Sequence, residues 1–153
     1  MSFYLVNEAP SPGTIDRPDL WLRPDASGIQ HTGNRLLALT GWTFEEYFLA
    51  FPWRTNLWRS SKRLWSAEGR LRAVAIRQEA KDREACGIIV LGVHAADCFG
   101  LRDWPFFTWK AGPVKVAAVP NPCGRAKFWS ASDARPRAAA FFKDALARVR
   151  AAS

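Results

Sequence analysis

Apolar residues gather along the chain in short continuous runs, and these runs predict three buried strands. The runs span residues 3–6, 87–91 and 114–119. Each is followed directly by asparagine, glycine or proline, and such bounded apolar runs are typical of strands covered on both faces. Residues 54–58 are brief and extended in character, and we expect them to supply a fourth strand.

Between and after these strands, apolar residues recur at the spacing of a helix. Helices are expected at residues 33–41, 43–51, 67–83, 93–99 and 134–151. The last helix carries its apolar residues on one stripe, which consists of Ala138, Phe141, Phe142, Ala145, Leu146 and Val149. Asp133 precedes this helix and is its expected N-cap. Residues 14–32 and 103–112 show no clear period and are expected to form connections.

Strands that alternate with helices predict a three-layer α/β/α sandwich with a central, mostly parallel four-stranded sheet. The 153 residues suit one domain, spanning residues 1–153. Ligands of such sheets bind outside the carboxyl ends of the strands. Two proline- and glycine-containing loops, residues 7–13 and 120–125, follow the first and last strands. We therefore expect both loops to converge on one crevice.

The chain is strongly basic, with 22 lysine and arginine residues against 14 aspartate and glutamate, a formal charge of +8 and a pI near 10.0. This charge favours a nucleic-acid partner, although charge alone also fits a basic protein with another role. Residues 53–65 interleave cations with tryptophans. That stretch suits either contacts with a nucleic-acid backbone and base stacking, or a packed helix with the apolar parts of its arginine side chains lying along its surface.

Cysteine and histidine usage points to a reducing compartment and to no bound metal. The three cysteines include no CxxC pair, which excludes a disulfide framework. His31 and His94 lack carboxylate or cysteine companions at ligand spacing, so we expect no metal and no cofactor. The sequence shows no leader pattern and no apolar run long enough for a membrane span. A monomeric, cytoplasmic and nucleoid-associated protein is expected.

Two loop motifs resemble a known family. Residues 6–13 read Val-Asn-Glu-Ala-Pro-Ser-Pro-Gly, and residues 119–125 read Val-Pro-Asn-Pro-Cys-Gly-Arg. The first resembles the Gly-Glu-Ala-Pro-Gly first motif of the thermophile-type branch of the uracil-DNA glycosylase superfamily, and the second resembles the superfamily's His/Asn-Pro-Ser-Gly last motif. Residues 33–37, 54–57 and 90–92 resemble its intervening motifs in the same order. The resemblance covers nearly the whole chain.

This resemblance implies a DNA glycosylase of base excision repair, acting on uracil or a related modified or mismatched pyrimidine in duplex or single-stranded DNA. Breaking an N-glycosidic bond develops positive charge on the sugar, which the Glu8 carboxylate can stabilise while it positions water. The departing base carries negative charge, and Asn121 is placed to donate to its oxygen. Asn56 corresponds to the asparagine whose amide pairs with a carbonyl and an imide N–H of a flipped uracil.

The resemblance also implies lesser contacts and shows departures from the family pattern. Ile29 and Ala9 correspond to base-pocket positions. The segment that enters the duplex where the base has left corresponds to Cys123, Gly124, Arg125 and Lys127. Asn7 replaces a glycine, Cys123 a serine and Asn121 the histidine of many members, which keeps open the alternative of a non-catalytic member that binds nucleic acid or a free base. The four-cysteine iron–sulfur cluster of the thermophile-type branch is not expected, because only three cysteines occur, at unmatched positions.

Overall fold

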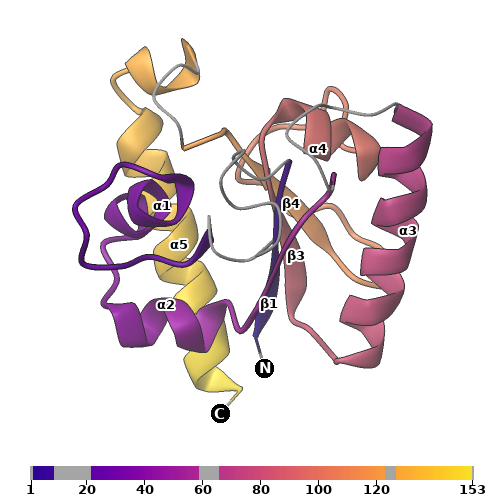
Figure 1. Cartoon of the computed structure of the whole chain (residues 1–153), viewed down its shortest axis with the longest axis horizontal. Helices are drawn as coiled ribbons and strands as arrows, with labels where there is room; N and C mark the ends of the chain where they lie inside the picture. The colour runs from indigo at the N-terminus through magenta and orange to yellow at the C-terminus, as the bar shows by residue number, and fades with distance from the viewer. Residues whose placement is uncertain (1, 9–21, 59–65, 123–126, 153) are drawn as a thin grey trace.

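A central sheet of four parallel strands organises the molecule (Figure 1). The computed structural model describes residues 2–8, 22–58, 66–122 and 127–152. The strands are β1 (Phe3–Asn7), β2 (Trp53–Asn56), β3 (Gly87–Leu91) and β4 (Val116–Val119), and they lie in the order β2-β1-β3-β4. All three strand pairs are parallel. The predicted sheet is thereby confirmed, in its fully parallel form.

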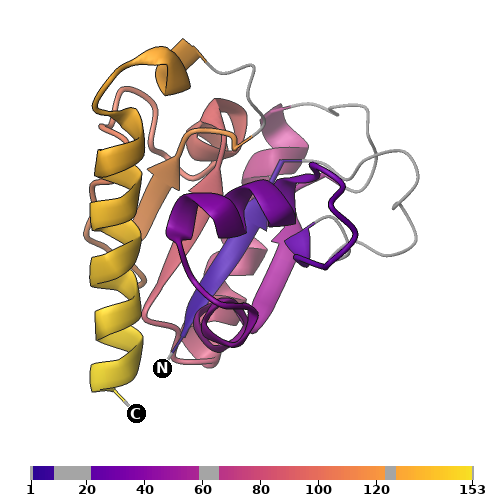
Figure 2. The same cartoon turned by 90° about the vertical axis from the view of Figure 1, so that its left-hand side faces the viewer.

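Helices cover both faces of this sheet and make the predicted three layers (Figures 1 and 2). One face carries α1 (Thr32–Thr40), α2 (Phe44–Ala50) and α5 (Ala134–Ala151), and the other carries α3 (Ser66–Asp82) and α4 (Val93–Cys98). A short 3-10 helix, η3 (Lys127–Ser130), precedes α5. This arrangement confirms the three-layer α/β/α class expected from the sequence.

Alternation along each strand divides the core into two clusters. In β1, Phe3 and Leu5 point toward α1, α2 and α5, whereas Tyr4 and Val6 point toward α3 and α4. Every residue of β1, β3 and β4 is buried, which explains why these strands read as continuous apolar runs instead of alternating ones. The predicted stripe of α5 is buried against the first cluster in full.

Local signals set most helix ends where the sequence places them. Thr43 and Glu46 form a reciprocal capping box at the start of α2. Gly41 ends α1 with a φ of 69°, a left-handed conformation that suits glycine. Two details differ from expectation. The N-cap of α1 is His31, whose side chain accepts from the Asn34 N–H, and Asp133 occupies the N-cap position of α5 without a side-chain cap hydrogen bond.

Strand β4 begins at residue 116, later than the predicted residue 114. The backbone of Val116 pairs in antiparallel fashion with Lys110 on the outer edge of β4, and Phe107 donates to Ala118 further along. The connection at residues 103–112 therefore covers the outer edge of the sheet. Since an uncovered edge strand invites pairing with other chains, this loop protects the fold from edge-to-edge association.

Candidate functional site

The carboxyl ends of the four strands form one edge of the sheet, and the chain changes direction there. From β1 the chain crosses to β2 on one side, whereas β3 leads to β4 on the other side. The helices that follow β1 and β3 lie on opposite faces. Such a switch point opens a crevice between the two strand ends, and it is the usual ligand site in open parallel sheets. Residues 9–21, 59–65 and 123–126 continue the chain from this edge and lie outside the described residues.

Glu8 follows β1 directly and stands at this switch point. Its carboxylate Oε1 accepts a hydrogen bond of 3.2 Å from the backbone N–H of His94, in the first turn of α4. The carbonyl of Glu8 accepts from the Trp58 N–H at 2.8 Å, which continues the β1–β2 pairing beyond the strand. Backbone and side chain of Glu8 are thus both fixed, by segments 50 and 86 residues away in sequence.

Gly92 joins β3 to α4 and makes room for the Glu8 carboxylate. Its φ is 95°, and a β-carbon there would collide with the Glu8 carboxylate, with the carboxyl carbon only 2.8 Å away. Its N–H donates to the Val119 carbonyl at 2.9 Å, which fixes the strand end against β4. Backbone conformation therefore favours glycine at position 92, and a β-carbon there would require the Glu8 carboxylate to move. The sequence motif at residues 90–92 marked this glycine, but not its contact with Glu8.

Asn56 ends β2 and is paired with Asn7 at the end of β1. The two residues face each other in the strand register, and Asn7 Nδ2 donates to Asn56 Oδ1 at 3.2 Å. Both side chains are only 4% exposed. Asn7, which departs from the glycine of the resembled pattern, thus orients the amide of Asn56. Sequence reasoning missed this partner, because strand order and register decide it.

Asn121 lies beyond the end of β4, on the far side of β3 from Glu8. Its backbone carbonyl accepts a 2.7 Å hydrogen bond from the indole Nε1 of Trp129 in η3. Neighbouring strands lie about 4.8 Å apart, so the backbones of β1 and β4 are separated by roughly 10 Å. Glu8 and Asn121 therefore flank the end of β3 from its two sides.

The remaining predicted site residues are not brought to this edge by any described contact. Ile29 is 62% exposed on the loop before α1, where its carbonyl accepts from the Asn34 side chain. Lys127 begins η3, and its side chain lies outside the described part. The same holds for the predicted base contact and the predicted duplex-entering residues Ala9, Cys123, Gly124 and Arg125, which fall in segments that are not described.

The aromatic residues near the site pack within the protein where they are described. Trp58 is buried beside the position of Gly69, and Trp53 lies under the Arg83 guanidinium at 5.5 Å. Phe128 contacts the rings of Phe106 and Phe107 at 5.5 and 5.8 Å between centroids. This packing favours a core role for these rings over base stacking.

No group of three or more histidine, cysteine or acidic residues within the described ranges is placed to hold a metal ion. No helix in those same ranges has the length and apolar character that crossing a membrane requires.

No family model and no curated protein matches the chain. Its chemistry is therefore inferred from the residues at the carboxyl edge of the sheet.

Proposed function

We propose that the chain is a DNA glycosylase that removes uracil or a related modified or mismatched pyrimidine from DNA. The observation that carries the proposal is the position of Glu8, whose carboxylate is fixed by the His94 N–H at the β1/β3 switch point. A ligand at the usual site of such a sheet lies within reach of that carboxylate. The formal charge of +8 supports a polyanionic partner.

The proposed reaction uses two groups on opposite sides of the end of β3. The base is first flipped out of the helix, and water then attacks the sugar carbon as the bond to the base breaks. Glu8 stabilises the positive charge that develops on the sugar and orients the attacking water. The Asn121 amide donates to the departing base, whose oxygen gains negative charge. Asparagine donates without becoming cationic, so its stabilisation is weaker than that of a histidinium.

Base selection in this proposal rests on Asn56. Its amide offers one donor and one acceptor, which match a carbonyl and an imide N–H of uracil but not the edge of cytosine. Asn7 supports this role because it holds the Asn56 amide in one orientation from the neighbouring strand. An amide oxygen has two lone pairs, so Asn56 Oδ1 can accept from Asn7 and from a base together.

A lesion-panel incision assay tests the function. Duplex and single-stranded oligonucleotides carrying one uracil, mismatched thymine or hydroxymethylated pyrimidine are treated with protein and then alkali, which cuts at abasic sites. We expect cutting at one or more lesions and a loss of about a hundredfold or more in Glu8→Gln. Glu45→Gln, an exposed carboxylate on α2, is the matched control and should retain full activity.

The competing possibility is a non-catalytic member that binds DNA or a free base. It is favoured by the replacements at Asn7, Asn121 and Cys123 relative to the resembled motifs. Salt-dependent binding to the same oligonucleotides with no abasic product over the whole panel would select it and refute the glycosylase. Absence of both binding and cutting would refute both.

A further inference from the structure

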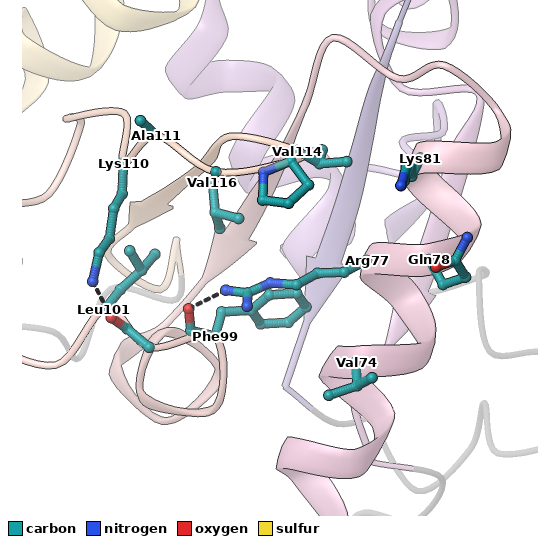
Figure 3. Close-up of a pocket in the computed structure, with 13 residues that line it drawn as sticks. Val74, Arg77, Gln78, Lys81, Phe99, Leu101, Lys110, Ala111, Val114 and Val116 are labelled. Atoms are coloured by element: carbon teal, nitrogen blue, oxygen red, sulfur yellow. Dashed lines mark hydrogen bonds between the residues drawn. The ribbon is translucent and has the colours of Figure 1, made fainter.

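A concave region lies on the α3/α4 face, away from the carboxyl edge of the sheet. It is a pocket of about 510 Å³ between α3, the end of α4 and the loop that precedes β4 (Figure 3). Phe99, Leu101 and Val116, each nearly fully buried, form its apolar floor, and Val74 and Val114 line its sides. No described residue that the proposed glycosylase uses lines it. The volume is in the range of small-molecule sites, which span about 300–1,000 Å³.

Among the described residues, three cations line this pocket around its apolar floor and no acidic residue does. They are Arg77 and Lys81 on α3 and Lys110 on the loop opposite (Figure 3). These groups come from segments about 30 residues apart, so the positive charge is assembled by the fold. The arrangement gives the pocket an electrostatic preference for an anion.

Two of the cations are held in place by the protein. The Arg77 guanidinium lies 5.5 Å from the centre of the Phe99 ring and donates to the Phe99 carbonyl. The Lys110 ammonium donates to the Gly100 carbonyl at 3.0 Å and lies 5.4 Å from the Trp104 ring. A guanidinium has five N–H donors and an ammonium three, so each keeps donors for a ligand. Groups already positioned lose little conformational freedom when a ligand binds.

We propose that this pocket binds a small amphipathic anion, with an apolar body on the floor and a carboxylate, sulfonate or phosphate group between Arg77 and Lys110. The combination of an apolar floor and convergent cations distinguishes it from a surface that only follows a nucleic-acid backbone, which needs phosphate contacts and no apolar floor. The apolar side extends onto α3, where Leu71 and Val74 are 74% and 65% exposed one turn apart. A bound apolar body would cover part of this surface.

Anilinonaphthalene sulfonate is a suitable probe, because it combines an aromatic body with one anionic group and fluoresces when its surroundings become apolar. We expect saturable binding at one site per chain. Because Lys110 lies over the Trp104 ring, the Trp104 indole N–H resonance should shift during the titration. Near-ultraviolet circular dichroism of the tryptophans is the check that the protein stays folded during the titration. It separates binding at the pocket from binding to a loosened core.

Two variants test the two halves of the site. Lys81→Glu with Lys110→Glu should weaken binding about tenfold or more, because the pocket loses two of its three described cations and gains two carboxylates. The charge-matched control is Arg135→Glu with Lys143→Glu on α5, which packs against the opposite face, and it should bind normally. Val74→Trp should also weaken binding, by filling the side of the pocket without a change of charge.

Three results would overturn the proposal. One is absence of saturable binding up to millimolar probe, and another is equal weakening in the variants and in the charge-matched control. The third is displacement of the probe by a short undamaged DNA duplex at low salt, together with loss of duplex binding in the pocket variants. That result would make the region part of a DNA-binding surface. Displacement by dodecanoate or dodecyl phosphate, but not by inorganic phosphate, would support the amphipathic requirement and show which head group is preferred.

Discussion

The Glu8 carboxylate occupies the space that a side chain on Gly92 would need, with its carboxyl carbon 2.8 Å from the position of a β-carbon. The two residues directly follow the adjacent parallel strands β1 and β3 and lie 84 positions apart in sequence. Two residues beyond Gly92, the His94 N–H donates to the same carboxylate. The segment at the end of β3 therefore contacts and positions the Glu8 side chain, on which the proposed chemistry depends.

Replacing Gly92 by alanine should displace this carboxylate. The added methyl group collides with Glu8, and the φ of 95° is unfavourable for any residue with a side chain. We expect the variant to lose about 1–3 kcal/mol of stability and most of its base-excision activity. Thermal unfolding and incision of a uracil-containing oligonucleotide measure the two effects.

Gly41→Ala separates backbone strain from displacement of Glu8. Gly41 has a φ of 69° with nothing within 4 Å of an added β-carbon. This variant should be destabilised by less, because other residues adopt the left-handed helical conformation of Gly41 more readily than the φ of 95° and ψ of 157° at Gly92. It should keep its activity at temperatures where it is folded. Equal activity of the two alanine variants would contradict the role assigned to the Glu8–Gly92 contact.

The Asn7–Asn56 pair should show energetic coupling. Each single alanine variant removes one side of this buried hydrogen bond, which should cost about 1–3 kcal/mol. The double variant removes both groups of the hydrogen bond, so its loss of stability should be smaller than the sum of the two single losses. Denaturant unfolding of the four proteins gives the coupling. Strictly additive losses would show that the hydrogen bond contributes nothing.

Much of this fold can be predicted from the sequence, because buried parallel strands consist of continuous runs of apolar residues. Residues 87–91 and 134–151 form their elements at the predicted bounds. The fourth strand was also expected, and it forms at residues 53–56 instead of 54–58. The placement of candidate residues at strand ends followed from the same pattern, since loops after parallel strands share one edge.

The contacts of the site could not be read in the same way. The strand order β2-β1-β3-β4 decides which strands lie beside β1. The contact of Glu8 with Gly92 and the hydrogen bond between Asn7 and Asn56 both depend on this order. Long-range register decides each of these, and no local propensity encodes it.

The loop before α1 should lose stability in acid through Asp25. Its carboxylate accepts from the side chains of Ser27 and Asn34 and from the Ser27 N–H, and these bonds hold the pKa of Asp25 below its usual range. A lowered pKa in the folded state contributes stability above the ordinary value near 3.8, and this contribution is lost as the pH falls further. The melting-temperature difference between the wild type and Asp25→Ala should therefore shrink below about pH 4. Asp103→Asn is the control. A melting-temperature difference between the wild type and Asp25→Ala that stays constant with pH would contradict the role assigned to Asp25.

The two tyrosines should resist ionisation in the folded protein. Burial, followed by the hydrogen bond to Glu79, raises the pKa of Tyr4 to about 12, and burial raises the pKa of Tyr47, whose hydroxyl donates to the Leu22 carbonyl at 2.7 Å. A raised pKa in the folded state contributes stability that is fully present below pH 10 and is lost as the pH rises from there toward 12.

Tyrosinate absorbance should therefore stay flat around pH 10 and rise only as circular dichroism reports unfolding, whereas the urea-unfolded chain should titrate near 10. In Tyr4→Phe the remaining tyrosine should titrate in a single step that coincides with unfolding. Ionisation of either tyrosine near pH 10 with a native dichroism spectrum would contradict the burial of these side chains.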